Sequence, residues 1–106
     1  MVNPANIGDV AKRIGDEANA EAVILFGSYA KGDATENSDV DLLVIAESDL
    51  PRFKRSRRLY KLFKPYPFGM DILVYTPAEV EKGAKSSLSF VSTVLKEGKT
   101  VYVRRN

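Results

Sequence analysis

Cysteine and histidine are both absent from this chain of 106 residues. Without cysteine the protein has no thiol nucleophile, no disulfide and no cysteine-based zinc site. Without histidine it lacks the commonest general base and the commonest nitrogen ligand for metals. Any catalysis must therefore use carboxylates, hydroxyls, lysine or arginine. Any bound metal ion is expected to be a hard cation that prefers oxygen ligands.

Long hydrophobic segments and a strong charge imbalance are missing as well. No apolar run approaches the ~20 residues that a membrane-spanning helix needs, and the first ten residues lack the basic and apolar regions of a signal peptide. We therefore expect a cytoplasmic protein with no membrane partner. The net charge is only +2, so composition does not predict a nucleic-acid partner. At this length, residues 1–106 are expected to form one domain.

Short apolar runs predict the strands of a sheet. Residues 21–27, 39–47 and 70–76 each read as a buried strand, and residues 100–104 fit either a fourth strand or an extended tail. Helical segments separate these runs, which predicts an α/β (α+β) fold: a β-sheet with helices packed on it. The patterns do not decide between a parallel and a mixed strand order.

The helices are predicted from apolar spacing and capping signals. Residues 4–18 carry an apolar stripe after an Asn3-Pro4 start, and a possible capping box at Thr76 and Glu79 opens another helix. A helix over 87–98 should bury Leu88, Val91 and Leu95 on one face, with Phe90 and Val94 beside them and Gly98 as its end. The alternative is that this wide apolar face forms an interface.

A helix over 49–63, with Asp49 as a possible cap, contains most of a strongly basic stretch. We expect Phe53, Tyr60 and Phe63 to be its buried stripe, so that the charges face water. The alternative is a surface that steers a triphosphate, RNA or an acidic partner. The basic residues of the stretch are Arg52, Lys54, Arg55, Arg57, Arg58, Lys61 and Lys64.

Three carboxylates stand at the beginning of predicted strands. Asp39 and Asp41 point to the same face because strand side chains alternate, and Asp71 holds the comparable place in the next strand. If these strands are neighbours, the three anions converge, which is costly without a cation. Magnesium prefers such oxygen ligands, and two ions about 3.5–4 Å apart can clamp both oxygens of an in-line displacement. The alternative is a solvated strand start with acidic residues there by chance.

Gly27-Ser28 is a candidate phosphate-binding turn at the end of a strand. Glycine lets the backbone approach a phosphate closely, and free N–H groups together with the Ser28 hydroxyl can bind its oxygens. A P-loop is excluded, because Asp33-Ala34 follows Gly32 where lysine and serine or threonine are required. Ser38 fits a site residue and a plain turn residue equally well.

Gly27-Ser28, followed after ten residues by Asp39-x-Asp41, resembles the signature of the minimal nucleotidyltransferases (MNT) of the DNA polymerase β-like superfamily. The strand "MDILVY" is similar to their third acidic strand, which places Asp71 in the third carboxylate position. The resemblance implies a nucleotidyltransferase fold and Mg²⁺-dependent transfer of a nucleotidyl group, with ATP as the expected donor of AMP. Asp39, Asp41 and Asp71 would be catalytic and would hold two Mg²⁺ ions, and Asp71 would help to deprotonate the acceptor.

The resemblance also implies a nucleotide site and a partner. Gly27, Ser28 and Ser38 would contact the nucleotide. Small members of the family are often antitoxins paired with a HEPN-domain toxin, and some attach AMP to a tyrosine of that toxin. Two alternatives stay open. The same fold could neutralise a toxin by contact with a vestigial site, although the complete acidic triad favours an enzyme. A transferase acting on a small molecule or RNA is a weaker alternative, because the chain leaves little length for an acceptor domain.

Overall fold

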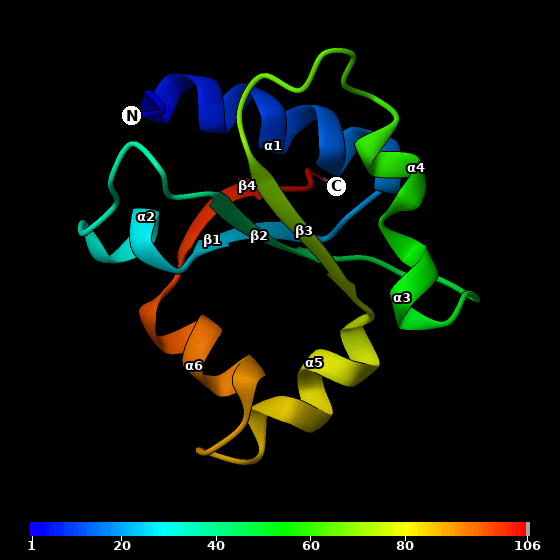
Figure 1. Ribbon diagram of the computed structural model, residues 1–106. Helices are drawn as coiled ribbons and strands as arrows, with labels where there is room; N and C mark the ends of the chain where they lie inside the picture. The colour runs from blue at the N-terminus through cyan, green and yellow to red at the C-terminus, as the bar shows by residue number, and fades with distance from the viewer. Residues whose placement is uncertain (106) are drawn as a thin grey trace.

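Four strands form one mixed β-sheet in the computed structural model, which describes residues 1–105 (Figure 1). The strands are β1 (Ala22–Phe26), β2 (Val40–Ile45), β3 (Met70–Tyr75) and β4 (Lys99–Val103), and their spatial order is β3-β2-β1-β4. β1 runs antiparallel to both β2 and β4, whereas β2 and β3 are parallel. The predicted sheet with packed helices is confirmed, and the strand order that the sequence left open is mixed.

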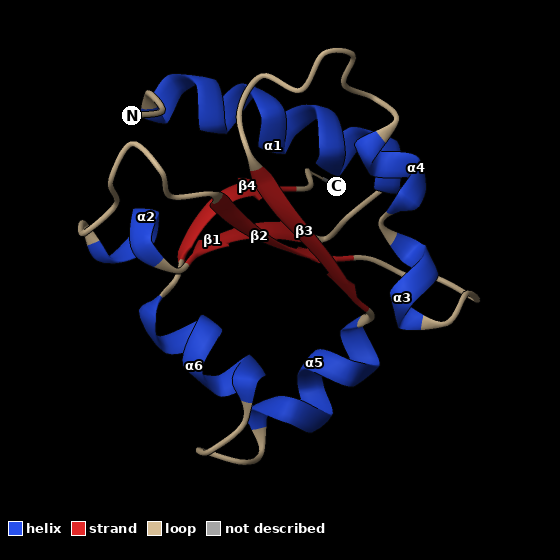
Figure 2. Cartoon of the chain, viewed as in Figure 1, coloured by secondary structure: helices blue, strands red, loops and turns tan. Residues whose placement is uncertain are grey.

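Helices cover both faces of the sheet, as Figure 2 shows. α1 lies along one face, and α5 and α6 lie against the other. The helices are α1 (Pro4–Ala18), α2 (Ser28–Lys31), α3 (Arg52–Arg55), α4 (Arg57–Tyr60), α5 (Pro77–Ala84) and α6 (Phe90–Glu97). Within residues 1–105 no helix combines the length and the apolarity needed to cross a membrane.

α1 and the sheet face beneath it form the main core. The Asn3 side chain accepts a hydrogen bond from the Ala5 N–H (2.8 Å) and so caps the helix. The helix ends at Ala18, and its C-cap residue Asn19 adopts a left-handed conformation. The apolar stripe predicted for this helix is buried against alternate residues of the strands. The buried residues include Ile7, Val10, Ala11, Ile14 and Ala18 from α1 and Val23, Leu25, Val40, Leu42, Val44, Ile72 and Val74 from the strands.

The opposite sheet face carries a smaller core under α5 and α6. Ile24, Leu43 and Ile45 pack there with Val94 of α6. Leu73 of β3, on the same face, remains 37% exposed. The helices therefore leave part of this face, along β3, open to solvent.

The predicted helix over 49–63 is wrong in its extent and in one of its buried residues. The segment forms two four-residue helices, α3 and α4, which meet at Ser56, and Pro51 rather than Asp49 stands at the N-cap. Phe53 is 71% exposed, while Leu59 is buried in its place beside Phe63. Phe53 is exposed because the nearby Arg55 side chain turns inward.

The Arg55 guanidinium anchors α3 to the edge of the sheet. Its side chain is only 9% exposed, and it donates to the Val74 carbonyl (3.2 Å) and to Glu79 Oε1 (2.6 Å). The rotation that buries Arg55 leaves Phe53 on the outside. The expectation that all the charges of this stretch face water is therefore wrong for Arg55.

The last predicted helix starts later than its apolar pattern indicates. Ser89 caps α6 by accepting from the Ser92 N–H (3.0 Å), and its hydroxyl donates to the Gly83 carbonyl (2.6 Å). These bonds exclude Leu88 from the helix, and it is 94% exposed. Leu95 is 42% exposed, so the prediction that Leu88 and Leu95 are buried is wrong, whereas the predicted burial of Val91 is confirmed and Val94 is buried as well. Gly98 is the C-cap, as predicted.

Glu79 joins the capping box of α5 to the Arg55 anchor. It accepts from the Thr76 N–H (2.8 Å), its own N–H donates to Thr76 Oγ1 (3.2 Å), and both Arg55 and Arg52 bind its carboxylate. The predicted capping box is thus confirmed. The hydrogen bond from Arg55 is the main cause that lowers the pKa of Glu79 from 4.5 to about 2, with further lowering by Thr76 and Arg52 against the opposing effect of burial.

Glu79→Gln is expected to lower the free energy of unfolding by about 1–2 kcal/mol at pH 7, the range for a charge-assisted bond reduced for partial exposure. Since the folded-state pKa lies below the unfolded value, this contribution is complete above about pH 4.5 and is lost as the pH falls towards 2. Urea unfolding at pH 7 and pH 2.5 measures both effects. Glu97→Gln removes an exposed ion pair with Lys31 and serves as the control, with an expected loss below about 0.5 kcal/mol. Equal losses for both variants would contradict the role given to Glu79.

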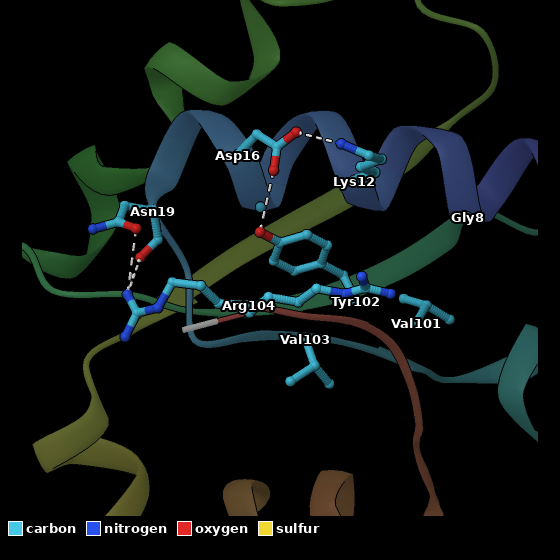
Figure 3. A pocket seen from close by; sticks show the side chains of 10 residues that line it. Gly8, Lys12, Asp16, Asn19, Val101, Tyr102, Val103 and Arg104 are labelled. Carbon is cyan, nitrogen blue, oxygen red and sulfur yellow. Dashed lines mark hydrogen bonds and ion pairs between the residues drawn. The ribbon is translucent and has the colours of Figure 1, made fainter.

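A groove of about 660 Å³ between α1 and β4 has polar groups that bind one another (Figure 3). Asp16 accepts from Lys12 Nζ (2.8 Å) and from the Tyr102 hydroxyl (3.2 Å), and Arg104 donates to the Asn19 carbonyl (2.9 Å). The Tyr102 ring fills the space beside Gly15 that a Cβ there would occupy. These contacts fasten the edge strand β4 to α1. The six predicted site residues, all in the described part of the chain, lie outside the groove.

Candidate functional site

The parallel pairing of β2 and β3 brings the acidic residues together. Asp41 is directly opposite Asp71 in the register, and Asp39 immediately precedes β2. The neighbouring residues Val40 and Leu42 point into the core beneath α1, so the three carboxylates belong to the opposite, partly open face. The sequence analysis left the adjacency of the two strands as a condition, and the structure meets it.

Asp41 is the central carboxylate of this acidic cluster. It is half-buried, whereas Asp39 and Asp71 are exposed. Burial, followed by the charges of Asp71 and Asp39, raises the pKa of Asp41 above its usual value. Within residues 1–105 no three potential ligand side chains are already gathered closely enough to hold a metal ion. Like charges are expected to stay apart until a cation lies between them.

Two glycines make room for the carboxylates. Gly27 has φ +72° and ψ −153°, and a Cβ at this position would overlap Asp41 Oδ2. A Cβ at Gly69, just before β3, would overlap Asp39 Oδ1. Gly27 therefore leaves space for the Asp41 carboxylate, in addition to its predicted role of letting the backbone approach a phosphate. Gly69 was missed by the sequence analysis, and its only signal was its place directly before the third acidic strand.

Gly27-Ser28 lies beside the acidic cluster. The turn follows Phe26, which is paired with Asp41 across β1 and β2, and it leads directly into α2. Within residues 1–105 the Ser28 hydroxyl makes no hydrogen bond, so it is available to a ligand. The turn and the carboxylates thus occupy one end of the sheet.

Ser38 lies in the loop that precedes β2. Its hydroxyl accepts a hydrogen bond from the Thr35 N–H (2.9 Å) and contacts Thr35 Oγ1 (3.3 Å). These contacts fold the loop back on itself just before Asp39 and favour the interpretation of Ser38 as a turn residue. Its contact with a nucleotide stays a prediction.

Tyr60 also belongs to the surroundings of the site, and the sequence analysis assigned it only to a buried stripe. Its hydroxyl accepts from the Ile72 N–H (2.8 Å) and donates to the Met70 carbonyl (3.3 Å). Burial raises the pKa of Tyr60, the bond from Ile72 partly offsets this, and the charges of Asp71 and Asp39 raise the pKa further. No sequence pattern marks this contact, because it joins α4 to β3 across an irregular loop.

The nucleotidyltransferase domain model matches residues 7–104 of the chain. Among curated proteins, two relatives from Methanocaldococcus jannaschii bear the name "putative protein adenylyltransferase". One is 40% identical over 67 residues, which are 63% of this chain and 66% of that protein. The other is 38% identical over 80 residues, which are 76% of each chain. The match therefore spans just under two thirds of the first relative's length.

Two solved structures share the fold. One, from Sulfolobus solfataricus, is described as a "putative nucleotidyltransferase"; it has a TM-score of 0.63 and 22% identity, and the match covers 95% of this chain and 84% of that one. The other is a toxin-antitoxin crystallised with AMP-PNP; it has a TM-score of 0.62 and 22% identity, and the match covers 92% and 74% of the two chains. Together with the domain model, which covers nearly the whole chain, and with the acidic cluster beside Gly27-Ser28, these similarities lead to one conclusion: the chain belongs to the nucleotidyltransferase domain family.

Proposed function

We propose that residues 1–106 act as one Mg²⁺-dependent nucleotidyltransferase domain that transfers AMP from ATP to a hydroxyl group, which we expect to be a tyrosine of a HEPN-domain toxin. The observation that carries the proposal is the register of β2 and β3, which sets Asp41 opposite Asp71, with Asp39 beside them and Gly27-Ser28 at the same end of the sheet. The names of the relatives and the AMP-PNP in the toxin-antitoxin structure support the choice of nucleotide and of acceptor class.

The donor set of the acidic cluster fits magnesium. Asp39, Asp41 and Asp71 offer only oxygen ligands, and burial, together with the charges of Asp71 and Asp39, raises the pKa of Asp41. These three residues would hold the ions, two in number by the general pattern for in-line displacement. Bound Mg²⁺ would neutralise the triphosphate and make an acceptor hydroxyl more acidic.

Each residue of the site then has a defined task. Gly27-Ser28 binds and orients the triphosphate. Asp71 accepts the proton of the acceptor hydroxyl, whose oxygen forms a bond to the α-phosphorus while the bond to the bridging oxygen breaks and pyrophosphate leaves. A tyrosine suits this chemistry because a phenol has a pKa near 10, well below that of an aliphatic alcohol. The exposure of Asp71 and Leu73 leaves this face accessible to a protein acceptor.

The test is intact-mass spectrometry of a HEPN-domain partner co-expressed with this protein. We expect the partner to gain one or more AMP units with the wild type and none with Asp71→Asn. Calorimetry should show that Asp71→Asn keeps much of the affinity for ATP with Mg²⁺, because Asp39 and Asp41 remain. A partner neutralised without added mass, by the wild type and by Asp71→Asn alike, would favour the alternative of a binding module that acts by contact.

A further inference from the structure

β3 is an edge strand, so one side of its backbone has no neighbouring strand. The Val40 N–H donates to the Gly69 carbonyl (2.9 Å), which shows that Gly69 turns its backbone groups towards β2. Backbone groups alternate in direction along a strand, so Met70 and Ile72 turn theirs towards the open side. Asp71, the second residue of β3, is therefore carried by a strand whose flanking backbone groups lack a strand partner.

The Tyr60 hydroxyl binds both of these outward groups. It accepts from the Ile72 N–H at 2.8 Å and donates to the Met70 carbonyl at 3.3 Å, so a single oxygen spans the strand on either side of Asp71. The ring itself is held in place. The ring packs edge-on against Tyr66, with centroids 6.1 Å apart. The preceding residue in the chain, Leu59, is fully buried in the main core.

We propose that Tyr60 is a positioning residue for Asp71: its hydroxyl closes the open edge of β3 around this residue and keeps the Asp71 carboxylate opposite Asp41. The inference rests on the proposed function, in which Asp71 accepts the proton of the acceptor. The first residues of an edge strand have hydrogen bonds on one side only, and an irregular loop precedes them here. Without the bridge, the segment that carries Asp71 is free to shift. A shift of a catalytic group by about 1 Å can lower the reaction rate as much as 10²-fold.

Tyr60→Phe tests the proposal because it keeps the ring and removes only the hydroxyl. We expect kcat for AMP transfer to fall about 10- to 100-fold, within the range for a misplaced catalytic group. The KM for ATP should change less than two-fold, because Asp39, Asp41 and Gly27-Ser28 are untouched. Hydrogen exchange of the Ile72 amide, followed by NMR without nucleotide, should become at least ten-fold faster.

Tyr102→Phe is the matched control. It also removes a tyrosine hydroxyl, but Tyr102 belongs to β4, the edge strand on the far side of the sheet, and its hydroxyl donates to Asp16 of α1 (3.2 Å). We expect this variant to keep the kinetics of the wild type and the slow exchange of Ile72. Equal losses of kcat in the two variants, in proportion to their melting temperatures, would assign Tyr60 a general structural role and overturn the proposal.

The remaining outcomes separate this inference from the proposed function. A Tyr60→Phe variant with the wild-type kcat would overturn the positioning role while leaving the nucleotidyltransferase intact. If the wild type transfers no AMP, the proposed function fails. Hydrogen exchange of the Ile72 amide then tests by itself whether the Tyr60 hydroxyl holds the edge of β3. Unchanged exchange in Tyr60→Phe would overturn that role too, and faster exchange confined to this variant would support it.

Discussion

Asp41→Asn is expected to reduce nucleotidyl transfer by at least about 10³-fold, or ~4 kcal/mol of transition-state stabilisation, because it removes the central carboxylate of the proposed metal site. The same variant should be more stable than the wild type in the absence of nucleotide. Burial and the charges of Asp71 and Asp39 raise the pKa of Asp41, so its ionised form is disfavoured in the folded protein. The neutral amide removes that cost at pH 7.

The sign of the stability change can be followed with pH. A carboxyl group with a folded-state pKa above its unfolded value favours folding at low pH and loses this contribution as the pH rises through the folded-state pKa. The melting temperature of Asp41→Asn should therefore exceed that of the wild type at pH 7, and the difference should shrink as the pH approaches 4. Calorimetric melting of the nucleotide-free proteins measures this difference.

Asp9→Asn provides the control for this prediction, since Asp9 is an exposed carboxylate on α1. It should leave both the transfer rate and the melting temperature close to those of the wild type. Full transfer activity in Asp41→Asn would remove Asp41 from the catalytic site. A lower melting temperature at pH 7 would contradict the electrostatic account of the acidic cluster.

Gly27→Ala is expected to lower the transfer rate by about 10²-fold or more, in line with the cost of misplacing a catalytic group, and to destabilise the protein by about 1–3 kcal/mol. The backbone of Gly27 (φ +72°, ψ −153°) lies in a region that is essentially restricted to glycine. A methyl group there would also overlap Asp41 Oδ2, so the carboxylate must move. Transfer assays and urea unfolding measure the two effects separately.

Gly32→Ala separates backbone strain from the effect on the site. Gly32 also has a positive φ, of +81°, but a Cβ there would meet no atom within 4 Å. We expect a stability loss of about 1 kcal/mol, the usual cost of a non-glycine residue in a left-handed conformation, with little change in transfer. If Gly27→Ala were as active as Gly32→Ala, the packing of Gly27 against Asp41 would have no catalytic consequence.

The sequence by itself determined the features that local spacing encodes. The 3.6-residue stripe of α1, the apolar runs of β1, β2 and β3 and the capping box at Thr76 all depend on neighbours within a few residues, and all were predicted correctly. The paired spacing of Asp39 and Asp41 likewise follows from strand alternation, which places both on one face. The third position, Asp71, came from its matching place at the head of a similar strand.

Only the tertiary structure decided which strands are neighbours and in which direction they run. Asp41 and Asp71 are thirty positions apart in the chain, and their register depends on how the whole sheet packs. The two wrong predictions of buried residues have the same cause, which is a contact with a distant part of the chain. Phe53 is exposed because Arg55 turns inward to bind Glu79 of α5. Leu88 lies outside α6 because the Ser89 hydroxyl donates to the Gly83 carbonyl of α5. The sequence analysis did not predict the contacts of the Tyr60 hydroxyl, because its partners are backbone atoms of β3. Every residue type has such atoms, so no residue pattern predicts the contact.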